Sequence, residues 1–95
     1  RLGGDLSNLD KSQASKYGIE GGVVVKKVFD NGALKNARVQ PGFIITSIVT
    51  SDGEQEITSV DDLNNILQGL SGTVSMRGIY SNYGETYTYP LNLDQ

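Results

Sequence analysis

The most distinctive hydrophobic pattern lies between residues 59 and 70, where apolar side chains recur every three or four positions. The members of this stripe are Val60, Leu63, Ile66, Leu67 and Leu70. Such spacing predicts an amphipathic helix with one buried face. Ser59 precedes the stripe as a suitable N-cap, two aspartates occupy the first turn, and Gly69 marks the end. We expect this helix to form one wall of a binding groove.

The remaining apolar positions follow the patterns of β-strands. Two runs rich in β-branched and aliphatic residues predict strong strands, and two later runs alternate with a period of two, as in a hairpin. The expected strands cover residues 4–6, 23–29, 43–49, 54–57, 73–80 and 85–93. Short helices are expected at residues 11–17 and 32–37. The sequence therefore predicts one mainly β domain, residues 1–95, with five to six strands and two or three helices in a compact sheet or partly open barrel.

Tyrosines are concentrated in the expected terminal hairpin. They are Tyr80, Tyr83, Tyr87 and Tyr89. A contact patch is one interpretation, but cross-strand aromatic pairing explains them more simply. Arg77 is a candidate cation–π partner for these rings.

The composition excludes several classes of catalytic site and metal site. The chain has 95 residues, a net charge of −3, no cysteine and no histidine. Thiol catalysis, Ser-His-Asp catalysis and the usual zinc sites all need residues that are missing. Asp61 and Asp62 are adjacent on a helix, so their carboxylates point in different directions. We expect no catalytic residues, no metal site and no cofactor.

The composition also indicates which kinds of binding partner to expect. The eight lysines and arginines are scattered, with Lys26-Lys27 as the one adjacent pair, so we expect no nucleic acid partner. No apolar run approaches the ~18 residues of a membrane span, so we expect no membrane insertion. Because the chain begins in the middle of an apparent domain pattern, we expect it to be a segment of a longer protein.

Four motifs in order make the chain similar to a known family. They are Gly22-Val23, then Gly32-Ala33 with Ala37, then Pro41-Gly42-Phe43-Ile44-Ile45, and finally Ser59-Val60-Asp61-Asp62-Leu63. Together they resemble a bacterial PDZ domain, and more narrowly the C-terminal PDZ domain of the HtrA/Deg family of envelope serine proteases. The resemblance covers essentially the whole chain and implies a PDZ-like, partly open β-barrel or sandwich with the circularly permuted bacterial strand order. The chain departs from the family pattern at Phe43, where an aspartate is usual, and in a longer loop at residues 50–56.

What the resemblance implies is peptide binding by strand addition. An extended peptide would pair with the edge at residues 3–6, its side chains would lie against the long helix, and backbone N–H groups of an N-terminal loop would hold its C-terminal carboxylate. The implied peptide-binding residues are Arg1, Leu2, Gly3, Gly4, Asp5, Leu6, Val60, Asn64 and Leu67. An aliphatic lining would favour an apolar residue at the end of the peptide. The family's aliphatic-Gly-aliphatic loop is represented only by residues 1–4, so Gly3 and Gly4 also fit a simple bulge.

The resemblance leaves two roles open for a domain without enzymatic activity of its own. It could recognise C-termini or unfolded segments of substrate proteins for a parent serine endopeptidase in the periplasm or cell envelope. Alternatively, it could pack against a neighbouring protease or PDZ domain of the parent chain as an assembly module with a vestigial groove. A PDZ domain of another protease class, either processing or intramembrane, is a third possibility.

Overall fold

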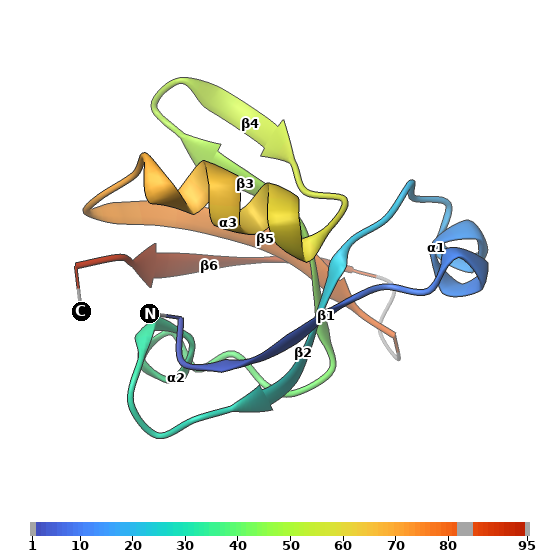
Figure 1. Ribbon diagram of the computed structural model, residues 1–95, viewed down its shortest axis with the longest axis horizontal. Coiled ribbons are helices and arrows are strands. Elements are labelled where there is room, and N and C mark those ends of the chain that lie inside the picture. Colours follow the sequence, from blue (N-terminus) through green and yellow to red (C-terminus); the bar gives the residue numbers. More distant parts are fainter. Residues whose placement is uncertain (1, 82–84, 95) are drawn as a thin grey trace.

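The computed structural model describes residues 2–81 and 85–94, which form six strands and three helices (Figure 1). The strands are β1 (Gly4–Asn8), β2 (Val23–Val28), β3 (Phe43–Thr50), β4 (Gly53–Glu56), β5 (Thr73–Tyr80) and β6 (Thr86–Asn92). The helices are α1 (Lys11–Tyr17), α2 (Ala33–Asn36) and α3 (Val60–Gln68). Every element expected from the sequence is present in the expected order, although β1 runs two residues further than predicted.

The strands form one antiparallel sheet in the order β1-β2-β3-β5-β6, and β4 pairs with β3 outside this path. β3 is the centre of the sheet because it pairs with β2, β4 and β5. The β2–β3 pairing is short and joins Val23 and Val24 to Ile45 and Ile44. Since β1 and β6 end the path, each presents one unpaired edge within the described part of the chain.

The main core lies on one face of this sheet. Phe43, Ile45 and Ile48 of β3 are fully buried there, together with Leu63 of α3 and Leu34 of α2. A register shift between Ile45 and Ser47 lets β3 keep aliphatic side chains on this face along its length. Burial of each such side chain stabilises the fold by ~1.5–3 kcal/mol.

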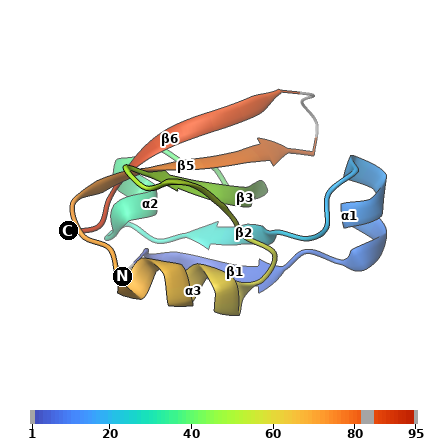
Figure 2. The same cartoon turned by 90° about the horizontal axis from the view of Figure 1, so that it is seen from above.

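A smaller cluster holds α1 in place at one end of the molecule. Leu9, Ala14 and Ile44 are buried together there. In Figures 1 and 2, α1 lies beyond the sheet at the far end of β1, away from the helices that cover the main core.

The predicted fold class is confirmed. The chain is mainly β, with an open antiparallel sheet of six strands and three helices over the described residues, consistent with a PDZ-like, partly open β fold. Residues 1, 82–84 and 95 lie outside the described part of the chain, which includes the predicted site residue Arg1 and the hairpin residue Tyr83.

Three tyrosines of the hairpin, Tyr80, Tyr87 and Tyr89, pack against the main core. The ring centroid of Phe43 lies 5.0 Å from that of Tyr80 and 5.1 Å from that of Tyr89, and the hydroxyls of Tyr80 and Tyr89 are 2.7 Å apart. The suggestion of a cation–π partner was wrong. Arg77 lies three residues before Tyr80 in β5, so its side chain points to the opposite face of the sheet, where it forms an ion pair with Glu54 at 3.4 Å.

Candidate functional site

The open edge of β1 faces α3. Among the described strands β1 pairs only with β2, and α3 packs alongside it on its other side, with the opposite chain direction (Figure 2). An edge strand presents alternate backbone N–H and C=O groups that have no partner in the sheet. The two elements therefore form the walls of a groove with backbone hydrogen-bonding groups on one side and side chains on the other.

A pocket of about 400 Å³ occupies the space between these two walls. It is lined by Leu2, Gly3, Gly4, Leu6, Asn64, Leu67 and Gln68. The leucines contribute apolar side chains to the lining, and both amide side chains, Asn64 and Gln68, are exposed on α3. The pocket thus combines an apolar surface for a side chain with polar groups at its margin.

The structure brings together six of the nine residues that the sequence suggested for peptide binding: Leu2, Gly3, Gly4, Leu6, Asn64 and Leu67. Two others lie elsewhere. The side chain of Asp5 is exposed and does not line the pocket, since neighbouring residues of a strand point to opposite faces. Val60 packs against the main core rather than lining the pocket. Arg1 lies outside the described residues.

One pocket residue was missed. Gln68 lies one helical turn after Asn64, so the same i, i+4 spacing that selected Val60 and Asn64 could have identified it. The residues of α3 that line the groove therefore lie nearer its C-terminal end than the sequence predicted, and they share the pocket with Gly3 and Gly4.

Backbone hydrogen bonds orient the loop at this end of the groove. The carbonyl of Leu2 accepts from the amide of Leu34 at 3.0 Å, and the carbonyl of Gly3 accepts from the amide of Phe29 at 2.7 Å. In a trans peptide unit the C=O and the following N–H point in opposite directions, and the described chain has no cis peptide. The N–H groups of Gly3 and Gly4 therefore point away from Leu34 and Phe29. That geometry allows them to donate to an anion in the groove.

The two loop glycines also have a packing role. Gly3 has a positive φ of 82°, and a Cβ at this position would collide with the carbonyl oxygen of Asn31. A Cβ on Gly4 would collide with the carbonyl oxygen of Lys27. Close backbone approach therefore accounts for both glycines, and glycine identity alone does not indicate a ligand.

Three side chains fix the start of α3 beside β1. The hydroxyl of Ser59 accepts from the amide of Asp62 at 3.1 Å, as the sequence predicted for an N-cap. The carboxylate of Asp62 accepts from both the hydroxyl and the amide of Thr58. These hydrogen bonds stabilise the charged form and lower the pKa of Asp62 below its ordinary value of 3.8. In addition, Oδ1 of Asn8 accepts from the amide of Val60 at 2.7 Å.

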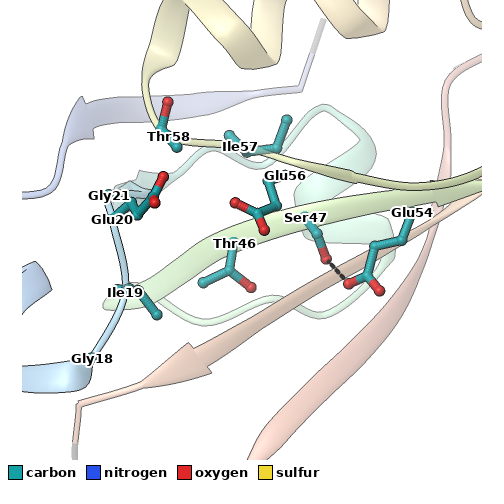
Figure 3. A pocket seen from close by; sticks show the side chains of 10 residues that line it. All are labelled: Gly18, Ile19, Glu20, Gly21, Thr46, Ser47, Glu54, Glu56, Ile57 and Thr58. Carbon is teal, nitrogen blue, oxygen red and sulfur yellow. Dashed lines mark hydrogen bonds between the residues drawn. The ribbon is translucent and has the colours of Figure 1, made fainter.

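A second hollow of about 290 Å³ lies between β3, β4 and the loop after α1 (Figure 3). Glu20, Glu54 and Glu56 contribute to its lining. The hydroxyl of Ser47 donates to Oε2 of Glu54 at 2.6 Å, and Arg77 pairs with the same carboxylate. Glu54 therefore already has a hydrogen-bonding partner and a counter-charge.

A third hollow, of about 430 Å³, lies between the segment from Gln40 to Gly42 and the hairpin tyrosines. The Tyr80 hydroxyl accepts from the amide of Gln40 at 3.1 Å and contacts the hydroxyl of Tyr89. These polar groups bind one another within the domain. Neither this hollow nor the acidic one combines an open strand edge with a helix wall.

The described residues form neither a metal-binding cluster nor a membrane-spanning helix. No group of three or more acidic side chains there is arranged to hold a metal ion. No helix among the described residues has the length and apolar character to cross a membrane.

No family model and no curated protein sequence matches this chain.

Proposed function

We propose that this domain is a non-catalytic module that binds extended peptides by strand addition, with preference for free C-termini that end in an apolar residue. One observation carries the proposal. A pocket of about 400 Å³ lies between the unpaired edge of β1 and α3, and its lining joins the Gly3-Gly4 backbone to apolar side chains. Strand addition requires both an open edge and pockets for alternate side chains.

The other edges of the sheet are less suited to a peptide strand. β6 contains Pro90, which has no N–H to donate to an added strand. β4 is four residues long, and Glu54 and Glu56 give it a charged character that discourages edge pairing. These differences favour β1 as the edge to which a peptide would add.

The expected pose follows from the chemistry of the two ends of the pocket. The peptide carboxylate would accept from the N–H groups of Gly3 and Gly4, as charge-assisted hydrogen bonds. Its last side chain would lie against Leu2, Leu6 and Leu67. Burial of one aliphatic side chain there would contribute ~1.5–3 kcal/mol to binding. A binding free energy of this size suits a module that binds many different C-termini weakly.

The biological setting is also a proposal and rests on the sequence resemblance. We propose that the parent chain is an HtrA/Deg-type serine endopeptidase of the cell envelope, and that the module presents C-termini or unfolded segments of substrates to it. An assembly role is the second candidate. It is favoured by the close approach of Gly3 to Asn31, which explains the loop glycines through packing within the domain.

The proposal can be tested by titrating the isotope-labelled domain with short apolar-ended peptides, each paired with its C-terminally amidated form. We expect amide shifts in β1 and in the C-terminal half of α3 for the free-carboxylate peptides, and much weaker shifts for the amidated ones. The reason is that amidation removes the negative charge that the loop N–H groups would bind.

Two asparagines of α3 provide a matched pair of variants. Asn64 and Asn65 are both exposed, but only Asn64 lines the pocket. Asn64→Tyr should fill the groove and reduce affinity about tenfold or more, whereas Asn65→Tyr should bind as the unmodified domain does. Equal affinity of both variants would show that the peptides bind outside this groove. An absence of shifts with every peptide would argue for the assembly role instead.

A further inference from the structure

Asn8 joins the two walls of the groove at the end opposite Gly3 and Gly4. It is the last residue of β1, and its Oδ1 accepts from the backbone amide of Val60, the first residue of α3, at 2.7 Å. Because α3 runs in the opposite direction to β1, the end of the strand and the start of the helix lie at the same end of the groove (Figure 2). This hydrogen bond links residues 52 positions apart in the sequence.

The pocket ends before this link. On the β1 side its lining extends from Leu2 to Leu6, and on the α3 side it extends from Gln68 back to Asn64. Neither Asn8 nor Val60 is part of the lining. The hydrogen bond therefore spans the space through which a longer peptide would leave the groove.

The Asn8–Val60 hydrogen bond stabilises the first turn of α3. The first amides of an α-helix have no partner inside the helix, so an external acceptor at Val60 satisfies a group that would otherwise need water. Ser59 serves a different amide, that of Asp62. The Asn8 side chain is exposed at the surface, so we expect its hydrogen bond to stabilise the contact between β1 and α3 and not the core.

We infer that Asn8 is a specificity-determining residue that limits how many peptide residues the groove holds, an inference that rests on the proposed peptide-binding function. An added strand advances ~3.3 Å per residue. A peptide anchored at Gly3 and Gly4 therefore reaches the level of Asn8 after about four residues. Residues beyond that point must either turn away into solvent or break the Asn8–Val60 hydrogen bond.

The inference predicts a length limit. Affinity of the unmodified domain should rise with peptide length up to about four residues and then stay level. In Asn8→Ala the link is lost and the end of the groove is open. Each of the next two residues should then raise affinity, by roughly fivefold where it forms a backbone hydrogen bond with the edge.

The experiment is calorimetric titration of a nested set of peptides of about three to eight residues that share one apolar C-terminal sequence. Asn8→Asp serves as the rescue variant, because a carboxylate retains the acceptor oxygen and is favoured at a helix N-terminus. In this variant the affinity should again stop rising with peptide length beyond about four residues. Asn92→Ala is the matched control, since Asn92 also accepts from a backbone amide, that of Asp94 at 3.0 Å, but at the end of β6. It should behave as the unmodified domain.

Two failures are distinguishable. If the peptides bind but longer ones gain affinity equally in the unmodified domain and in Asn8→Ala, the length limit is overturned while peptide binding stands. If no peptide of the set binds any variant, and each variant retains its circular dichroism spectrum, peptide binding and the length limit are both overturned.

Discussion

At the scale of single residues, one glycine determines how the hairpin packs on the central strand. Gly78 of β5 lies opposite Ile45 of β3 and Tyr87 of β6. A Cβ at this position would collide with the carbonyl oxygen of Ile44 and would lie 2.6 Å from the ring of Phe43. The missing side chain is what allows the Phe43 ring to approach Tyr80 and Tyr89.

Gly78→Ala should therefore lower the free energy of unfolding by about 1–3 kcal/mol, the usual range for overpacking a close-packed core. Urea denaturation measures this directly. Gly69→Ala is the matched control, because Gly69 has a negative φ and a Cβ there would meet no atom within 4 Å. A similar loss of stability in both variants would contradict this account of the hairpin.

Tyr89 causes the free energy of unfolding to decrease at alkaline pH. Burial, and secondly the hydrogen bond with Tyr80, raise the pKa of Tyr89 above its ordinary value of 10.0. The folded protein therefore keeps this proton after the unfolded chain has lost it, and stability falls as the pH rises above about 10. Below that pH the proton is bound in both states, and this group adds no pH dependence.

We expect Tyr89→Phe to remove that part of the pH dependence. Urea denaturation near neutral pH and at pH values above about 10 should show a smaller alkaline loss of stability in the variant than in the unmodified domain. Because the two proteins differ at this one side chain, the difference between their pH curves isolates the tyrosine. Parallel pH curves would exclude this role for Tyr89.

At the scale of elements, α3 is the part of the site that its own sequence predicts best. The apolar stripe indicated a helix, Ser59 was expected as its N-cap, and both are present. Ser59→Ala should cost ~1 kcal/mol of stability, since the amide of Asp62 loses its acceptor. Denaturation of Ser59→Ala beside Ser71→Ala, an exposed serine after the helix, checks this. Equal stability of the two variants would show that the cap contributes nothing.

The same element shows where prediction from sequence ends. A stripe of apolar residues defines a helix face only to within about one residue, so Val60 was assigned to the groove and Gln68 was missed. The extent of β1 depends on pairing, because Ser7 and Asn8 join the strand opposite Val24 and Val23. The Asn8–Val60 link depends on residues far apart in sequence, and no local pattern reports it.

At the scale of the whole molecule, the alternation of strands and helices was sufficient to predict a mainly β domain with an open sheet. The fold explains why a groove exists: β1 lies at the end of the sheet path and α3 returns beside it. At the other end of the sheet, Pro90 of β6 disfavours the addition of a peptide strand. Peptide binding at β1 is therefore the central claim.

The most direct test is to measure nuclear Overhauser effects between an unlabelled apolar-ended peptide and the isotope-labelled domain. The account predicts interstrand contacts between the peptide backbone and Gly4 to Leu6, and contacts between the last peptide side chain and Leu67. Contacts with β4 or β6 instead, or none at peptide concentrations that saturate binding, would contradict it.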